Sequence, residues 1–458
     1  MKIIKTYKFR LNPNKETLAM LKQHGGNSRF IWNQLVNFSS EYNKLNNKFP
    51  TQSILQKEII KIKSENDFLK ISHSQPLQIN AQRLMKTNLK SITKEVLSKR
   101  KQKIAKAKTP KQIATAINFG KPKFKSKHNN SDSIFYPQNF KIKKSRLFVA
   151  KIGWVNFIKH REILGKPLTL TIRQDGEQWN CSISCELNIK EKPKVSLDKA
   201  NIVGIDLGTK SFATLSDKSV IANPRTLKKH LKKLKKEQKI LSKRQFVEKE
   251  INGKAVTVSS NNRTKQRIKV QKIHRKIRNI RSDFLHKTTH HLINNYDGFS
   301  LETLDIKKLM EEGKNKSKGL NKSICDVSWF EFCRILEYKS VWHAKHFVKI
   351  DKYFPSTKKC SQCDNIISME LENRKYDCPE CGNRMDRDYN ASLNIYDEGL
   401  NILNTLATKE IYACGQSAKQ IGKTTLRVVG SKKSLKNVDS GLCPRSYSLK
   451  PLPLGRGC

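Results

Sequence analysis

Residues 201–224 read NIVGIDLGTKSFATLSDKSVIANP and set the organisation of the C-terminal half of the chain. An apolar run ends at Asp206 and a glycine turn, and two short segments rich in β-forming residues follow. Short apolar runs bounded by turn residues are typical of buried strands. The stretch therefore predicts a three-strand meander that carries an acidic residue near the end of its first strand.

Two basic helices are predicted directly after this meander, at 226–244 and 263–281. The first has nine Lys/Arg and one Glu, and the second has nine and none. Each carries one narrow apolar stripe at helical spacing, and a merely solvated face would mix charge signs. We expect an antiparallel pair within 225–291 whose outer faces meet phosphates, with candidate contacts at Lys228, Lys232, Arg267, Lys272 and Arg275. Residues 247–262 read as an insertion that lengthens the turn between the helices.

Two further acidic residues stand at the ends of predicted elements. A short strand, DGFSL at 297–301, delivers Glu302, and Asp388 precedes an apolar helix in MDRDYNASLNI. Each has a plain structural explanation when taken alone, as a strand-end carboxylate or a helix cap. In an RNase H type fold, however, these two points and Asp206 converge at one edge of the sheet. Three carboxylates there could hold two hard divalent ions about 4 Å apart for phosphodiester hydrolysis.

Four cysteines form two C-x2-C pairs, Cys360 with Cys363 and Cys378 with Cys381. This spacing predicts tetrahedral coordination of a structural zinc ion, and four ligands leave no open position for catalysis. A redox role needs only one pair in a βαβ context, which is missing. Cys181, Cys185 and Cys414 show no ligand spacing and are expected to be buried or incidental.

The N-terminal half mixes strands with a helical segment. A strand at 3–11 is followed by a helical pattern over 16–99, by a Lys-rich segment at 101–130 expected to be weakly ordered as a free chain, and by four strand patterns between 133 and 187. We expect the first strand to join the later ones in a small β-barrel with the helices inserted between them. A polar linker near 193–200 separates this half from the meander.

Composition narrows the functional classes. The chain has 458 residues, and 92 Lys plus Arg against 39 Asp plus Glu give a formal charge of +53. Such self-repulsion calls for a polyanion, and nucleic acid is the usual one. The basic start lacks the apolar core of a signal peptide and no window is long enough to span a membrane, so we expect a protein of the reducing cytoplasm that needs no membrane.

Several motifs resemble the transposon-encoded TnpB family, relatives of type V CRISPR effector nucleases. They are GIDLGTKSFATLS, LETLDIKKLM, STKKCSQCD with YDCPECGN, and MDRDYNASLNI, in that order. KTYKFRLNPNKE, FPTQSIL, KPKFKSK, IRNIRSDFLHK and WFEFCRILEYK also look like segments of the family. The resemblance extends from Lys5 to about 399. Departures are Glu302-Thr303-Leu304 for the usual Glu-Asp-Leu and Ser356-Thr357-Lys358 for Thr-Ser-Lys, and neither removes a metal ligand.

The resemblance implies an α+β multidomain fold. Its parts would be a wedge β-barrel (1–14 and 120–195), a helical recognition lobe (15–119), a RuvC-like domain of the RNase H type (200–357 and 384–406), an inserted four-cysteine zinc finger (358–383) and a flexible basic tail (407–458). Asp206, Glu302 and Asp388 would be the catalytic ligands of two Mg²⁺ ions. Whether Asp386 shares the metal or only caps the helix is left open.

The resemblance also implies partners. These are a guide RNA derived from the transposon end and double-stranded target DNA with a short flanking motif, bound by a monomer in a bacterial or archaeal cytoplasm, near the nucleoid. Tyr7, Lys8, Arg10, Lys123 and Lys125 are further candidate nucleic-acid contacts.

The alternatives are an RNA-guided DNA-binding repressor that does not cut, a guide-free transposase or resolvase, and a zinc-ribbon RNA-binding structural protein of ribosomal type. The ordered Asp, Glu, Asp set favours the nuclease, since the structural protein leaves it unexplained.

Overall fold

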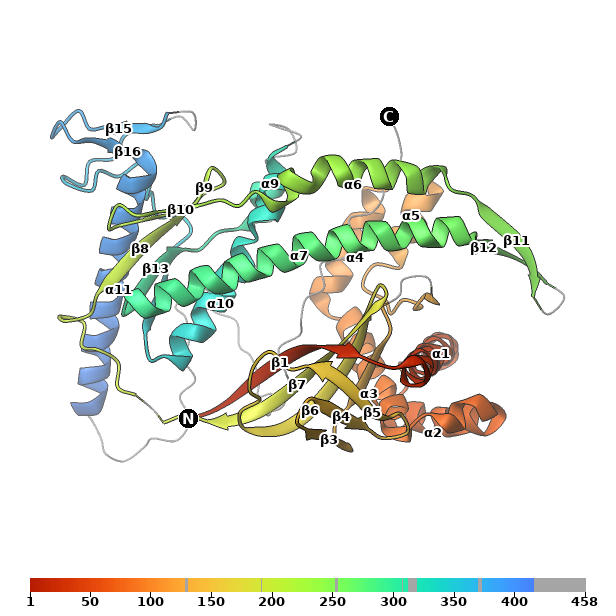
Figure 1. Ribbon diagram of the computed structural model, residues 1–458. Helices are drawn as coiled ribbons and strands as arrows, with labels where there is room; N and C mark the ends of the chain where they lie inside the picture. Colours follow the sequence, from red (N-terminus) through yellow and green to blue (C-terminus); the bar gives the residue numbers. More distant parts are fainter. Residues whose placement is uncertain are drawn as a thin grey trace.

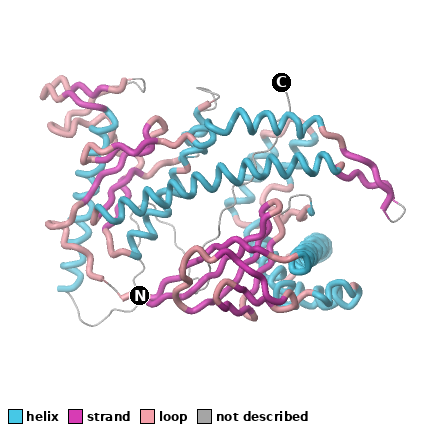
Figure 2. The backbone as a smooth tube through the Cα atoms, viewed as in Figure 1, coloured by secondary structure: helices cyan, strands magenta, loops and turns pink. Residues whose placement is uncertain are grey.

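The structure is a computed structural model that describes residues 1–127, 131–190, 192–251, 254–306, 308–311, 319–369 and 373–415. Two sheets dominate it, one in each half of the chain, and the long helix α7 (Asn261–Asn295) lies along both halves (Figure 1). Figure 2 separates the helices from the strands in the same view. No helix in the described part of the chain is long and apolar enough to cross a membrane.

The N-terminal sheet has seven antiparallel strands in the order β2-β6-β7-β1-β5-β4-β3. The strands are β1 (Lys2–Asn12), β2 (Ser133–Tyr136), β3 (Phe140–Lys143), β4 (Arg146–Val149), β5 (Gly153–Ile158), β6 (Lys166–Asp175) and β7 (Gln178–Asn188). Strand β1 joins the later strands, as the sequence predicts. The edge strands β2 and β3 are not paired with each other among the described residues, so the predicted barrel is a curled half-barrel.

Alternation along β1 explains the packing of this sheet. Tyr7, Phe9 and Leu11 are buried in the core of the half-barrel, while Lys8 and Arg10 between them are exposed. A period of two places alternate residues on opposite faces. Cys181 and Cys185, on β7, are buried in the same core, as expected from the sequence.

The inserted helical segment is built on its own core. Its helices are α1 (Lys15–Asn46), α2 (Gln52–Glu65), the 3₁₀ turn η1 (Asp67–Ile71), α3 (Ser74–Ser91), α4 (Lys94–Ala105) and α5 (Pro110–Ile117). Ile31, Leu35, Leu55 and Leu84 are buried together between α1, α2 and α3. Within 101–130, which the sequence predicts to be weakly ordered as a free chain, the folded protein contains the end of α4 and all of α5, which Thr109 caps and Pro110 begins.

The C-terminal sheet has five strands in the order β10-β9-β8-β13-β14. They are β8 (Ile202–Leu207), β9 (Ser211–Leu215), β10 (Val220–Ala222), β13 (Gly298–Glu302) and β14 (His346–Ile350). The predicted meander is confirmed as β8-β9-β10, and β8, β13 and β14 are parallel. Helices α7, α9 (Leu320–Val327) and α10 (Trp329–Trp342) supply the core on one face, and α11 (Arg387–Gly415) packs on the other.

The basic helices form the predicted antiparallel pair. Leu234 of α6 (Thr226–Lys243) packs against Val270, Ile273 and Ile277 of α7. The insertion between them forms a hairpin, β11 (Phe246–Ile251) with β12 (Lys254–Ser259), at the far end of the pair from the C-terminal sheet (Figure 1). Helix α7 continues past the predicted end at Arg281 and buries Thr289 and Leu292 beside the sheet.

The remaining differences lie in the last third of the chain. The sequence predicts a helix over 329–346 and a strand over 347–354, whereas helix α10 ends at Trp342 and strand β14 at Ile350. The backbone of α11 runs through 407–415, the start of the predicted tail. Residues 416–458 lie outside the described residues, as does the side chain of Cys414.

Candidate metal centres and nucleic-acid surfaces

Strand register brings Asp206 and Glu302 to the same edge of the C-terminal sheet. The parallel strands β8 and β13 pair Ile202 with Gly298 and Ile205 with Leu301. Asp206 and Glu302 are the next residue along each strand, so they lie at neighbouring positions where the strands end. The fold therefore aligns two carboxylates that are 96 positions apart in the sequence.

Close packing of α11 adds the third carboxylate. A Cβ atom on Gly204 would lie 2.2 Å from the carbonyl oxygen of Ser392, so the glycine allows the helix to approach β8. Leu403 packs with Ile202 further back along the strand. The helix thus runs antiparallel to β8, and its first turn, which contains Asp388, comes to the end of the strand where Asp206 lies.

A hydrogen bond and a second glycine fix the same helix on β13. Ser300 Oγ donates to the carbonyl oxygen of Ile395 at 2.7 Å. A Cβ atom on Gly399 would meet Ser300 Oγ at 2.0 Å. Since alternate strand residues share a face, Glu302 lies on the α11 face with Ser300. Asp206, Glu302 and Asp388 therefore meet at one corner of the domain.

The electrostatics of this corner reflect crowded negative charge. Burial, followed by the charges of Asp388 and Glu302, raises the pKa of Asp206 to about 7. Burial also raises the pKa of Glu302 to about 7. Arg387 Nη2 donates to Asp388 Oδ1 at 3.2 Å and offsets part of the charge. A bound cation would stabilise carboxylates that are crowded together in this way, and their hard oxygen donors suit Mg²⁺.

Asp386 has a structural task at the start of α11. Its Oδ1 accepts hydrogen bonds from the backbone N–H groups of Asp388 at 2.9 Å and Tyr389 at 3.1 Å. These are the bonds of a helix N-cap. The cap orients the turn that carries Asp388, so capping is one role that the structure gives to Asp386.

The four cysteines of the zinc finger converge as their spacing predicts. Cys360 Sγ lies 3.7 Å from Cys381 Sγ, and Cys363 Sγ lies 3.5 Å from Cys378 Sγ. All four sulfur atoms lie within 4.8 Å of one another, which no other group of metal-ligating side chains achieves in the described part of the chain. Tetrahedral zinc with Zn–S bonds near 2.3 Å separates its sulfurs by about 3.8 Å. The cluster therefore fits zinc.

Hydrogen bonds stabilise the thiolate of one of the four cysteines, Cys360. Burial of Cys360 opposes its ionisation, but the backbone amides of Gln362 and Cys363 and the side chain of Asn383 outweigh it and lower the pKa of its thiol to about 6. Gly382 takes the left-handed conformation, with φ +68°, in the turn after Cys378. Strands β15 (Lys375–Asp377) and β16 (Arg384–Asp386) connect the second cysteine pair to α11.

Two buried asparagines connect the finger to α11, and neither is among the site residues predicted from the sequence. Asn390 Nδ2 donates to the carbonyl oxygen of Lys359 at 2.7 Å, while its Oδ1 accepts from the N–H of Ser361 at 3.1 Å. Asn394 Nδ2 donates to the carbonyl oxygens of Ser356 and Lys359 at 2.8 and 2.7 Å. Amides at i and i+4 on an otherwise apolar helix were the available signal.

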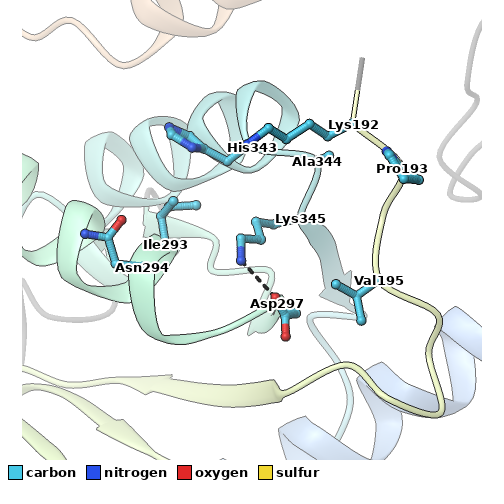
Figure 3. Close-up of a pocket in the computed structure, with 9 residues that line it drawn as sticks. All are labelled: Lys192, Pro193, Val195, Ile293, Asn294, Asp297, His343, Ala344 and Lys345. Carbon is cyan, nitrogen blue, oxygen red and sulfur yellow. Dashed lines mark hydrogen bonds and ion pairs between the residues drawn. The ribbon is translucent and has the colours of Figure 1, made fainter. Parts of the chain in front are cut away.

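A cavity of about 400 Å³ lies at the opposite edge of the sheet from the carboxylates, where β13 begins (Figure 3). Lys345 Nζ donates to Asp297 Oδ1 across it at 2.8 Å. Its one carboxylate is thus already paired, and Lys192 and His343 add further basic groups. The cavity lacks the acidic set that a two-metal hydrolytic site needs.

Most of the predicted nucleic-acid contacts are exposed. The exposed ones are Lys8, Arg10, Lys123, Lys125, Lys228, Lys232 and Lys272. Tyr7 is a correction to the sequence argument: its side chain is 1% exposed, and its hydroxyl accepts a hydrogen bond from the N–H of Leu164, so it is a core residue. Arg267 is half-buried.

Two predicted contacts on α7 also join the halves of the molecule. Lys272 forms an ion pair with Glu177 at 2.7 Å, and Arg275 Nη1 donates to the carbonyl oxygen of Asp175 at 2.8 Å. Asp175 is the last residue of β6, and Glu177 lies in the turn that leads to β7. At least part of the positive charge of α7 therefore serves to attach it to the half-barrel.

The class of the protein follows from these features together. A mixed sheet with an antiparallel meander, helices on both faces, three converging carboxylates and four clustered cysteines before α11 define a RuvC-like region with a four-cysteine zinc-finger cluster. The half-barrel and its helices precede it.

Comparisons with known proteins agree with this class. The model of a family described as "Probable transposase", IS605 OrfB, matches residues 182–312. A "Cas12f1-like, TNB domain" matches 329–395, and a "Helix-turn-helix domain" of IS605 OrfB matches 1–48, which here contains β1 and α1.

Curated relatives cover most of the chain. "Putative RNA-guided DNA endonuclease InsQ" of Escherichia coli K12 is 28% identical over 92% of this chain and 98% of its own length. A "Putative RNA-guided DNA endonuclease" of Streptomyces pristinaespiralis is 32% identical over 63% of this chain and 69% of its own. This chain belongs to the IS605 OrfB family, also known as TnpB.

Among solved structures, a Cas12f1-sgRNA-target DNA complex matches at 16% identity with a TM-score of 0.30, over 86% of this chain and 99% of that chain. CasPhi-2 (Cas12j) bound to crRNA matches at 9% identity with a TM-score of 0.41, over 87% and 98%.

Proposed function

We propose that this protein is an RNA-guided DNA endonuclease that cleaves target DNA at one site formed by Asp206, Glu302 and Asp388. The observation that carries the proposal is the meeting of these carboxylates at one corner, from two parallel strand ends and a helix start. The names of the curated relatives support the guided activity. The guide would derive from the transposon end, and the reaction would serve transposon maintenance or transposition.

The three carboxylates would hold two Mg²⁺ ions. When bound, such ions supply an activated water and neutralise charge on the leaving oxygen of a phosphodiester. The chain itself positions the ligands: β8 and β13 fix Asp206 and Glu302, and the Asp386 cap fixes Asp388. With a single site, the two strands of the target would be cut one after the other.

The zinc finger would have a structural role and no catalytic one. Four thiolates leave no open coordination position, and Asn390 and Asn394 connect the finger to the helix that bears Asp388. Zinc would therefore support cleavage indirectly, by holding α11 against the sheet.

The remaining parts would bind nucleic acid. The half-barrel and helical segment would act as wedge and recognition lobe around the guide–target heteroduplex and the flanking motif, read mainly through backbone contacts and base pairing. The exposed lysines of α6 would contact phosphates on the nuclease side. A monomer on one guide RNA in a bacterial or archaeal cytoplasm is the expected state.

The test is a plasmid-depletion experiment in cells. The protein is co-expressed with RNA that spans the 3′ end of its own gene, and the cells are challenged with a plasmid library of randomised flanks beside a matched target. Depletion should require the guide and disappear in Asp206→Ala, while Asp198→Ala, an exposed aspartate in the preceding linker, should deplete like the wild type. Guided binding without cleavage in the wild type would indicate a repressor, and no guide dependence would exclude both guided functions.

A further inference from the structure

A second, smaller hollow lies directly beside Glu302. Its volume is about 180 Å³, and Glu302, Lys308, Lys352 and Tyr353 are among the residues that line it. Tyr353 is 74% exposed, the most exposed aromatic side chain in the described chain. An aromatic ring this exposed leaves apolar surface in contact with water, and a ligand that covers the ring would remove that surface from water.

The backbone that leads to the ring is bonded to the strand end that carries Glu302. The end of β14, Ile350, pairs with Glu302, and Thr303 donates to the carbonyl oxygen of Ile350 through both its N–H, at 3.3 Å, and its Oγ1, at 2.8 Å. The N–H of Tyr353 donates to Asp351 Oδ1 at 2.7 Å. The loop after β14 is thus tied to the strand ends that carry the acidic residues.

Positive charge accompanies the ring. Lys352 Nζ lies over the Tyr353 ring, 4.5 Å from its centroid, and Lys308 lines the hollow together with Asp305. A cation-binding corner alone would not need lysines at its rim, because they repel metal ions. An aromatic ring, two ammonium groups and an acidic corner together match an unpaired nucleic-acid strand, which offers a base to stack, phosphates to pair and a phosphodiester to cut.

We propose that Tyr353 is a stacking platform for a base of the unpaired strand beside the scissile phosphate, with Lys352 and Lys308 on its phosphates. This inference rests on the proposed nuclease function and names the form in which the substrate enters the site. Stacking on an aromatic ring tolerates any base, because every base has a π-face. The site would therefore accept strands of any sequence once the guide has separated them.

Binding measured without cleavage tests the platform. Full-length Asp206→Asn protein with its guide and guide-matched target is titrated with a short single-stranded DNA, and the affinity is compared with that of Asp206→Asn carrying Tyr353→Ala or Tyr353→Phe. Loss of the ring should weaken binding by about 5- to 100-fold, and Phe should retain affinity within about two-fold. The same series is repeated with DNA in which one nucleotide at a time is abasic.

The abasic series separates stacking from charge. One abasic position should weaken binding to the Asp206→Asn protein with Tyr353 intact and have no further effect when Tyr353→Ala is also present, as expected for two partners of one contact. Equal binding of the Tyr353→Ala and Tyr353-intact proteins, or additive losses at every abasic position, would overturn the inference. Wild-type cleavage is followed in parallel, so a protein that binds as described but never cuts would contradict the proposed function and leave the platform standing.

Discussion

The two candidate metal centres are only a few residues apart along the chain at Cys381 and Asp388, yet they are built in opposite ways. The four cysteines come from a segment of 22 residues, 360–381, and their sulfurs already lie within 4.8 Å of one another. The three carboxylates come from β8, β13 and α11, which only the packing of the whole domain brings together. A closed structural site can therefore be assembled from one short segment, whereas the open site depends on packing between segments that are far apart in the sequence.

The largest effect should come from removing one carboxylate. Asp206→Asn or Glu302→Gln is expected to lower the guided cleavage rate by at least about 1,000-fold, because the ligands of a two-metal site act as a unit. Zinc content should be unchanged, because neither carboxylate is among the four zinc ligands. Radiolabelled target cleavage and metal analysis of the purified protein measure both.

Asp386→Asn is the matched control for that series, since it changes a neighbouring carboxylate that caps α11. Asn is itself a good N-cap, so cleavage should stay within about five-fold of the wild type. A loss as large as that of Asp206→Asn would mean that Asp386 also holds the metal.

Removal of a zinc ligand should act on both centres. Cys378→Ser is expected to lose zinc and destabilise the C-terminal half, with a secondary loss of cleavage because α11 is no longer held. Zinc quantification and melting curves measure the effect. Cys325→Ser, which changes an exposed free cysteine, is the control. Unchanged melting of the wild type after chelation of zinc would contradict a structural finger.

A smaller effect is expected from the connection between the finger and α11. Asn390→Ala leaves the carbonyl of Lys359 and the N–H of Ser361 without this partner, which should cost about 1–3 kcal/mol of unfolding free energy and lower cleavage without loss of zinc. Asn401→Ala, at an exposed position of the same helix, should change neither quantity. Denaturant unfolding with zinc analysis distinguishes the two variants.

The smallest effect concerns pH in the absence of divalent metal. The folded-state pKa of Asp206 is raised to about 7 from an ordinary value near 4, so between these values the folded state binds more protons than the unfolded state. Unfolding free energy should therefore fall as pH rises through this window. Asp206→Asn should melt several degrees above the wild type at pH 8, and the difference should narrow through this window and disappear only below about pH 4. If the difference in melting temperature between the two proteins stays constant with pH, the pKa of Asp206 is not raised in the folded state.

Much of the C-terminal half could be predicted from local pattern. The meander, the antiparallel helix pair and the cysteine cluster are short-range features, written in apolar periodicity and ligand spacing. The insertion at 247–262 formed a hairpin whose signal, Asn252-Gly253 between alternating strands, was present in the sequence. Tyr7 was also misjudged although the alternation with Lys8 and Arg10 places it on the core face.

Other features could not be predicted, because they depend on which distant segments meet. The attachment of Lys272 and Arg275 to the end of β6 and the turn after it depends on how α7 crosses the half-barrel. The bonds of Asn390 and Asn394 depend on a finger folded back onto α11, and no local periodicity encodes that contact. Whether the barrel closes likewise depends on whether the edge strands β2 and β3 pair, and that pairing is a tertiary contact that the local sequence does not encode.

A strand-resolved time course tests the central claim, that one corner of three carboxylates cuts both strands. Supercoiled plasmid with a matched target is incubated with guided wild-type protein and with Asp206→Asn, Glu302→Gln and Asp388→Asn, and nicked and linear products are followed. We predict a nicked intermediate before linear DNA in the wild type, and loss of both products in every variant. A variant that still nicks one strand at the wild-type rate would contradict a single site.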